Sequence, residues 1–133
     1  MLHKTFSIVL ITYLLPQFAY TENVARELQA SYQAQATTSF SGDAGKIKWN
    51  LEVQDKSGGT RSCTTCHTTD LTQAGKHTKT KKDIKPMALS ANRERYTDRK
   101  KIEKWFKRNC KWTWGRECTA QEKGNFLEYL LSQ

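Results

Sequence analysis

Three residues in the middle of the chain have the types and the spacing to attach a metalloporphyrin. Cys63 and Cys66 are separated by two threonines, and His67 follows directly, giving C-T-T-C-H. Two thiols at this spacing can form thioethers with the two vinyl groups at one edge of a porphyrin, and the adjacent imidazole can bind the iron. The motif therefore predicts one covalently attached haem c, with His67 as an axial ligand.

Two other kinds of site also use closely spaced cysteines. A zinc site would combine Cys63 and Cys66 with Cys110 and Cys118, but the second pair is spaced C-x7-C rather than C-x2–4-C. A thioredoxin-like redox pair would stand in a βαβ pattern, which the sequence around the motif lacks. Either alternative would give a protein without haem absorption, and the sequence favours haem attachment over both.

The N-terminal segment has the features of a secretory signal peptide. One lysine precedes a run of ten apolar residues, and a proline and a small residue, Ala19, follow. The run is shorter than the roughly 20 residues that span a bilayer, although an uncleaved N-terminal anchor is the alternative. We expect residues 1–21 to be removed, with cleavage after Ala19 or Thr21. Residues 22–133 would then form one periplasmic domain, peripheral to a membrane at most.

Length and composition limit the exported part to one small domain. The chain has 133 residues, a formal net charge of +9, 37% hydrophobic residues and a mean hydropathy of −0.76, which excludes a polytopic membrane protein. Four Trp, five Tyr and five Phe argue against disorder. Because the apolar fraction is low for a self-sufficient core, a disulfide, a metal or a cofactor is expected to complete it.

Apolar periodicity predicts four helices and no convincing strand, so the expected fold class is all-α. Two helices have capping residues at their starts, Ser41 and Thr97, and Thr119 with Glu122 forms a capping box for the last one. Residues 37–41 form a short linker. The predicted helices and their apolar residues are 22–35 (Val24, Leu28, Tyr32), the segment after Ser41 (Ala44, Ile47, Trp49), the segment after Thr97 (Ile102, Trp105, Phe106) and the segment after Thr119 (Phe126, Leu127, Leu130, Leu131).

The second axial ligand decides what such a haem protein does. Electron-transfer cytochromes c usually have a methionine there, in the loop before the last helix. The only methionines are Met1 and Met87, so the loop before the last helix contains no methionine that could bind the iron. Met87 follows His67 by 20 residues, where the chain wraps the histidine side, and we expect it to pack against the haem or the core. His77 lies in a very polar stretch and is expected to be a solvated surface residue.

Asn109 is a further candidate for the second axial position. It lies seven residues after Ile102 and four after Trp105, on the apolar stripe of its helix, and directly before Cys110. A polar amide on a buried face needs a partner, which iron would supply; a helix C-cap or a satisfied core amide fits the spacing equally well. In an oxidising compartment Cys110 and Cys118 can close a small loop that stabilises the fold by about 2–3 kcal/mol, with two free thiols as the alternative.

Positive charge is concentrated in residues 76–108, which hold thirteen Lys or Arg and four Asp or Glu. Such a segment can bind nucleic acid, but an exported haem domain rarely meets it, so we expect no nucleic-acid partner. The charge instead predicts a docking surface for an acidic electron donor, because opposite charges speed an oriented encounter. A solvated positive face without a partner is the alternative.

Several segments are similar to one family of class I cytochromes c. The most specific is R-N-C followed by G-R-x-C-T, and the C-x-x-C-H motif alone indicates only a c-type haem. Over residues 24–133 the chain resembles the oxygen-binding sphaeroides haem proteins, although the basic stretch 77–82 departs from their pattern. The similar segments are SCTTCH at 62–67, the Ala-Gly of QAGK at 73–76, KDIKP at 82–86, RYTD at 95–98, IEKWFKRNC at 102–110, GRECT at 115–119, and Gly45 with Trp49 as the Gly-x-x-x-aromatic pattern of a helix that crosses the last helix.

The resemblance has consequences for the site. It implies a class I cytochrome c-like helical fold around one haem, with Asn109 as the distal ligand on iron and a disulfide between Cys110 and Cys118. It also implies a dihaem cytochrome c as the electron donor.

A redox-gated function follows from these residues. A neutral amide is a hard, weak ligand that prefers ferric to ferrous iron, so we expect the reduced protein to release Asn109 and bind O2, NO or CO. Trp105, Trp112 and Trp114 are candidates for the wall of that pocket, with exposed interface aromatics as the alternative. The sequence contains no catalytic acid–base pair and no nucleophile motif, so we do not expect an ordinary enzyme. A weak reductase activity of the haem is the one enzymatic possibility. The competing hypothesis is a simple electron-transfer cytochrome in which Met87 or His77 permanently closes the sixth position.

Overall fold

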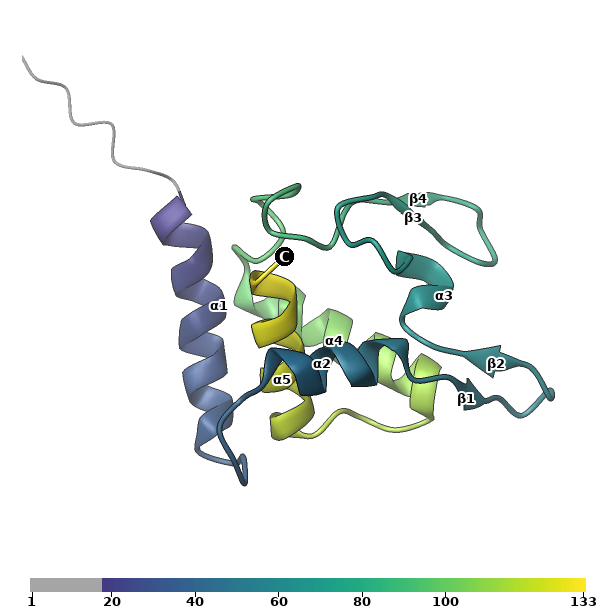
Figure 1. Ribbon diagram of the computed structural model, residues 1–133, viewed down its shortest axis with the longest axis horizontal. Helices are drawn as coiled ribbons and strands as arrows, with labels where there is room; N and C mark the ends of the chain where they lie inside the picture. The colour runs from purple at the N-terminus through teal and green to yellow at the C-terminus, as the bar shows by residue number, and fades with distance from the viewer. Residues whose placement is uncertain (1–17) are drawn as a thin grey trace, which may run out of the picture.

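The part of the chain that the structure, a computed structural model, describes is residues 18–133, and it consists of five helices and two very short strand pairs. This confirms the expected all-α class (Figure 1). The strands pair antiparallel, β1 (Val53–Gln54) with β2 (Thr60–Arg61) and β3 (Gly75–Lys76) with β4 (Asp83–Ile84). The helices are α1 (Phe18–Gln33), α2 (Gly42–Asn50), α3 (Thr64–His67), α4 (Arg99–Trp114) and α5 (Ala120–Leu131).

Most of the predicted signal peptide, residues 1–17, lies outside the described part of the chain. Its cleavage therefore stays a prediction, and α1 already begins at Phe18, earlier than expected. Among the helices of residues 18–133, none is long and apolar enough to cross a membrane.

The helix starts follow from local hydrogen bonds. The predicted capping box of α5 is present, since the Thr119 and Glu122 side chains each accept from the other residue's backbone N–H. For α4, however, the prediction of Thr97 as the cap is wrong. The carboxylate of Asp98 accepts from the Lys101 N–H at 3.0 Å. An ionised carboxylate at a helix N-terminus also interacts favourably with the helix dipole, which a hydroxyl does not.

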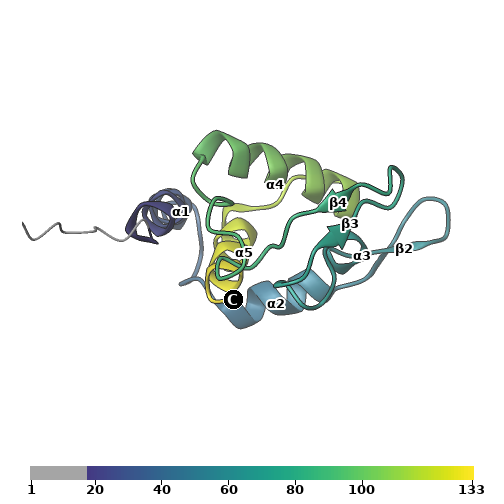
Figure 2. The same ribbon diagram turned by 90° about the horizontal axis from the view of Figure 1, so that it is seen from above.

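The core forms where α2 and α1 pack against α5. Figure 1 shows α2 crossing in front of α5, and in Figure 2 α5 lies between α2 and α4. Leu28 of α1 and Leu127 of α5 are the large side chains that are fully buried. Trp49 is also buried, at 5% exposure, whereas Ile47 is 72% exposed and does not belong to the apolar face on which we placed it. α3 and both strand pairs gather at the end of the molecule opposite α1 (Figures 1 and 2).

The crossing of α2 and α5 requires a glycine. A Cβ at Gly45 would collide with the carbonyl oxygen of Asn125, and would lie 2.8 Å from its carbonyl carbon and 2.9 Å from the Tyr129 Cβ. Backbone atoms of α5 cannot move aside without separating the helices. This close contact brings Trp49, one turn further along α2, against Phe126 and Tyr129.

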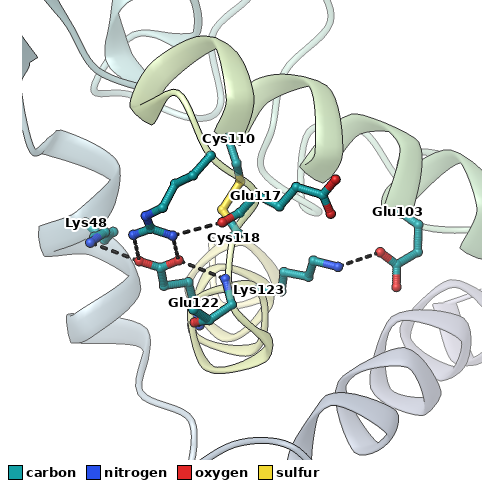
Figure 3. Close-up of a disulfide and its surroundings, with 9 residues drawn as sticks. Lys48, Glu103, Cys110, Glu117, Cys118, Glu122 and Lys123 are labelled. Carbon is teal, nitrogen blue, oxygen red and sulfur yellow. Dashed lines mark hydrogen bonds and ion pairs between the residues drawn. A yellow bond between two sulfur atoms is a disulfide. The ribbon is translucent and has the colours of Figure 1, made fainter.

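A disulfide ties the end of α4 to the start of α5. Cys110 and Cys118 are bonded, with their Cα atoms 5.6 Å apart, which confirms the predicted pairing (Figure 3). Charged side chains surround it: Glu122 accepts from Arg116 at 2.7 Å and pairs with Lys48 of α2 at 3.0 Å. The hydrogen bond from Arg116, and then the contacts from the Thr119 N–H and Lys48, lower the pKa of Glu122 to about 2. The loop between the helices is thus anchored covalently and ionically.

We predict that Gly45→Ala lowers the free energy of unfolding by about 1–3 kcal/mol, because the added methyl group overpacks the α2–α5 contact. Urea unfolding followed by circular dichroism measures the change. Gly42→Ala is the matched control in the same helix, because its Cβ would meet nothing closer than 3.7 Å. Equal loss in both variants would contradict the explanation.

Removing the disulfide should weaken the fold by a similar amount. For the Cys110→Ser/Cys118→Ser variant we expect a loss of about 2–3 kcal/mol, since the unfolded chain regains the entropy of an open loop. Urea unfolding of variant and wild type at equal haem loading tests this, and wild type treated with a thiol reductant should match the variant. A variant as stable as the oxidised wild type would refute it.

Candidate haem site

The C-T-T-C-H motif forms the single turn of α3, which ends at His67. Cys63 stands at the position before the helix, and Cys63 and Cys66 are free and half-buried thiols. Buried Ser62 anchors the start of the turn, because its N–H donates to the Thr65 hydroxyl at 2.9 Å. Both thiols and the imidazole are therefore presented from one short, fixed segment, as attachment to one porphyrin edge requires.

Burial keeps this segment uncharged. It raises the pKa of the Cys63 thiol to about 12. Burial, followed by the charge of Arg95, lowers the pKa of His67 to about 4, so the imidazole is neutral at physiological pH and has a lone pair for a metal. The Nδ1 atom of His67 is buried without a hydrogen-bond partner. The donor set and the orphaned ring nitrogen fit a haem bound at Cys63, Cys66 and His67.

Two neighbours hold α3 in place. The ring of Trp49 lies 5.4 Å from the ring of His67, which links the attachment segment to the helical core. On another side β3 lies directly on α3: a Cβ at Gly75 would collide with the Cys66 carbonyl oxygen and lie 2.9 Å from the His67 Cα. Only glycine permits this approach.

The predicted apolar stripe of α4 is in fact two adjacent stripes. Ile102, Cys110 and Thr113 are buried, and Phe106 is half-buried against the core. Asn109 is exposed, so the expectation that it lies on a buried face is wrong. It is not a helix C-cap either, because α4 continues to Trp114 and Gly115 has the left-handed capping conformation.

Asn109 instead belongs to an exposed stripe with two tryptophans. Trp105, Asn109 and Trp112 follow one another at i, i+4 and i+7, and the two indoles are 42% and 40% exposed. These are large apolar surfaces for a protein of this size to leave open, and they flank one carboxamide. We call residues 105, 109 and 112 the open stripe. Two indoles could pack against the face of a flat apolar ligand, and the carboxamide of Asn109 between them could make a polar contact near the centre of that ligand.

Arg61 connects the open stripe to the attachment segment. It lies in β2, two residues before Cys63, and its guanidinium donates to the Trp112 carbonyl at 3.1 Å and stacks on the Trp112 ring at 4.8 Å. Asp55, whose pKa is lowered to about 2 mainly by hydrogen bonds from Ser57, accepts from Arg61 at 2.9 Å. This bridge brings the C-terminal half of α4 to the start of the motif.

Other predicted site residues lie elsewhere. The backbone N–H of Met87 donates to the Leu71 carbonyl, so Met87 lies next to the segment that directly follows His67 in the sequence. His77 begins the tip between β3 and β4, where its Nδ1 accepts from the Thr80 N–H at 3.1 Å. Trp114 is on the flank of α4 away from the open stripe, stacked on Phe126 at 5.7 Å.

The zinc alternative does not agree with the structure. Cys110 and Cys118 are consumed in the disulfide, while Cys63 and Cys66 remain free, so the four sulfurs do not converge. Within the described residues, no group of three or more His, Cys, Asp or Glu side chains is placed to hold a metal ion.

Two arginines at the site were not predicted from the sequence. Arg61 bridges to α4, and Arg95 donates to the carbonyls of Lys85 and Pro86. Both lie among many exposed cations in the sequence, and no local pattern separates an arginine that binds backbone carbonyls from a solvated one. The one sequence signal for Arg61 was its position two residues before Cys63.

Comparison with known proteins agrees with this arrangement. Residues 35–130 match DUF1924, a domain of unknown function. The chain is 42% identical over 110 residues to cytochrome c-type protein SHP of Cereibacter sphaeroides, covering 80% of this chain and 82% of that protein. It is 35% identical over 116 residues to cytochrome c'' of Methylophilus methylotrophus, covering 87% and 76%.

Solved structures share the fold. The crystal structure of oxidised cytochrome c'' from Methylophilus methylotrophus matches with a TM-score of 0.74 and 31% identity, covering 87% of this chain and 96% of that one. Oxidised SHP, described as an oxygen-binding cytochrome c, matches with a TM-score of 0.73 and 38% identity, covering 82% and 96%. With its single C-x-x-C-H motif, the chain therefore belongs to the DUF1924 family and to the c-type cytochromes that include SHP and cytochrome c'', as a monohaem cytochrome whose cofactor is haem c.

Proposed function

We propose that this protein is a periplasmic monohaem cytochrome that accepts single electrons and, once reduced, binds a diatomic gas such as O2, NO or CO. Haem c supplies an iron that changes between ferric and ferrous states and has two axial positions. Cys63 and Cys66 would attach the porphyrin, and the neutral imidazole of His67 would hold one axial position. The observation that carries the proposal is the open stripe, which presents Asn109 between two exposed indoles.

Asn109 would act as a ligand that depends on oxidation state. Its carboxamide oxygen is a hard, neutral donor, which binds ferric iron in preference to ferrous iron. Asn109 would therefore hold ferric iron more tightly than ferrous iron, and a reduced haem would have room there for a gas molecule. Trp105 and Trp112, on either side along the helix, exclude water from that position. The disulfide one residue further on keeps Asn109 close enough to return.

The relatives support this assignment. SHP is described as an oxygen-binding cytochrome c, and a solution structure of cytochrome c'' addresses haem-ligand detachment in that protein. Met87 and His77, the competing sixth ligands, lie on segments attached to the stretch around His67, since the Met87 N–H donates to the Leu71 carbonyl and His77 follows β3, which lies on α3. Each would have to cross to the opposite face of a porphyrin, whereas Asn109 comes from a separate helix. A permanently closed electron-transfer site is therefore the less favoured function.

The electron donor would dock on only part of the basic segment. In space most of these charges lie in two places, at the β3–β4 tip with Lys79, Lys81 and Lys82, and on α4 with a separate group of cations. The tip is next to α3, because β3 lies on Cys66. An acidic donor, such as a dihaem cytochrome c, would reach the haem edge at Cys66 most directly from this tip.

We predict that Asn109→Ala changes the ferric absorption spectrum from low-spin to high-spin and leaves the ferrous spectrum unchanged. Imidazole should also bind the ferric variant about tenfold or more tightly, because it no longer competes with Asn109. Alanine is a better helix former than asparagine, so α4 should persist.

Lys104→Ala, an exposed position on the same helix, is the control and should behave as wild type. Carbon monoxide binding to the ferrous wild type completes the test. An unchanged ferric spectrum in Asn109→Ala, or a low-spin ferrous protein inert to carbon monoxide, would rule out the gated site in favour of plain electron transfer.

For the donor, we predict that the triple variant Lys79→Gln/Lys81→Gln/Lys82→Gln is reduced about tenfold more slowly by an acidic dihaem cytochrome c at low ionic strength. Stopped-flow reduction measures the rate. Lys100→Gln/Lys101→Gln/Lys104→Gln removes the same charge from α4 and should have a clearly smaller effect. At high salt the difference should vanish. Equal slowing by both triple variants would refute docking at the tip.

A further inference from the structure

Arg95 is a half-buried cation that holds the loop at residues 85–86. Its Nε donates to the Pro86 carbonyl at 2.7 Å, and another guanidinium nitrogen donates to the Lys85 carbonyl. Both acceptors are neutral. Within the described part of the chain, Arg95 forms no ion pair with a carboxylate. Its positive charge is therefore held in place but not neutralised.

The backbone that Arg95 holds is attached on both sides to the segment that carries His67. On one side of residues 85–86, Ile84 pairs with Gly75, which lies against the His67 Cα. On the other side, the N–H groups of residues 87–88 donate to the Leu71 carbonyl, four residues after His67. Residues 85–86 are thus held between two attachments to the segment that carries the imidazole.

The half-buried position of Arg95 strengthens its field. Its guanidinium is held by the backbone carbonyls of Lys85 and Pro86. A charge in a poorly solvated site interacts with its surroundings more strongly than one in water. An arginine also stays protonated throughout the physiological range, so the field does not depend on pH.

We propose that Arg95 sets the reduction potential of the haem, by placing a permanent positive charge on the loop that is attached to the segment of His67. Reduction adds one negative charge at the iron, and a nearby cation favours it. Arg95 would therefore raise the potential and make the ferrous, gas-binding state accessible to a weaker donor. The proposal rests on haem attachment at Cys63, Cys66 and His67, and it does not require Asn109 to be the sixth ligand.

The alternative is that Arg95 only fixes the loop at residues 85–86. Asn92 allows the two roles to be separated, because its Nδ2 donates to the same Pro86 carbonyl at 3.2 Å without carrying a charge. Lysine at position 95 keeps the charge but loses the paired donors of the guanidinium. Charge and hydrogen bonding can thus be removed one at a time.

The test is the midpoint potential of the haem-loaded protein, measured by spectroelectrochemistry for wild type, Arg95→Gln, Arg95→Lys and Asn92→Ala. If the charge acts, Arg95→Gln lowers the equilibrium constant for reduction about tenfold, or 59 mV for one electron. Arg95→Lys and Asn92→Ala should stay close to wild type. The difference between wild type and Arg95→Gln should be the same at pH 6 and pH 9.

A potential in Arg95→Gln equal to wild type would overturn the proposal. So would equal lowering in Arg95→Lys and Arg95→Gln, or in Asn92→Ala and Arg95→Gln, because the loop and not the charge would then be responsible. If Arg95→Gln does not fold, Arg95→Met removes the same charge and takes its place in each of these comparisons. A protein with no c-type absorption would instead refute the underlying haem assignment.

Discussion

The haem site depends on how one four-residue helix is held. A single turn such as α3 has no stability of its own, so its neighbours must fix the directions of the Cys63, Cys66 and His67 side chains. They do so through a backbone contact that only glycine allows at position 75, and through the ring of Trp49, which α2 brings from the core. The first contact comes from the strand that follows α3 and the second from a helix that precedes it, so neither is part of the motif itself.

α4 performs two tasks with two sides of one helix. Its buried residues and the disulfide attach it to α5, while the open stripe remains available to a ligand. The contact of Arg61 with Trp112 then sets the open stripe against the attachment segment. A rigid helix with an anchored end suits a ligand that must leave and return, because the side chain can move while the backbone stays in place.

Much of this could be predicted from local sequence signals. The C-x-x-C-H spacing, the capping box at Thr119 and the Gly-x-x-x-Trp pattern each act within a few residues, and the structure contains the elements they predict. For Asn109 the local signals were insufficient, because its spacing predicted a buried face of α4. The spacing of residues along a helix does not separate a stripe that faces the core from an adjacent stripe that is open to a ligand. Asp98, and not the predicted Thr97, caps α4, because local spacing does not fix which of two adjacent polar residues accepts from the helix N–H. Arg61 and Arg95 act through backbone carbonyls of other segments, which no residue pattern encodes.

The proposed function requires α4 to supply an oxidation-dependent ligand opposite His67. Crystal structures of the haem-loaded protein in the ferric and ferrous states test this requirement most directly. We predict a bond between the Asn109 carboxamide oxygen and iron in the ferric structure, and its absence in the ferrous one. A bond from the Met87 sulfur or the His77 imidazole in both states would contradict the proposed function.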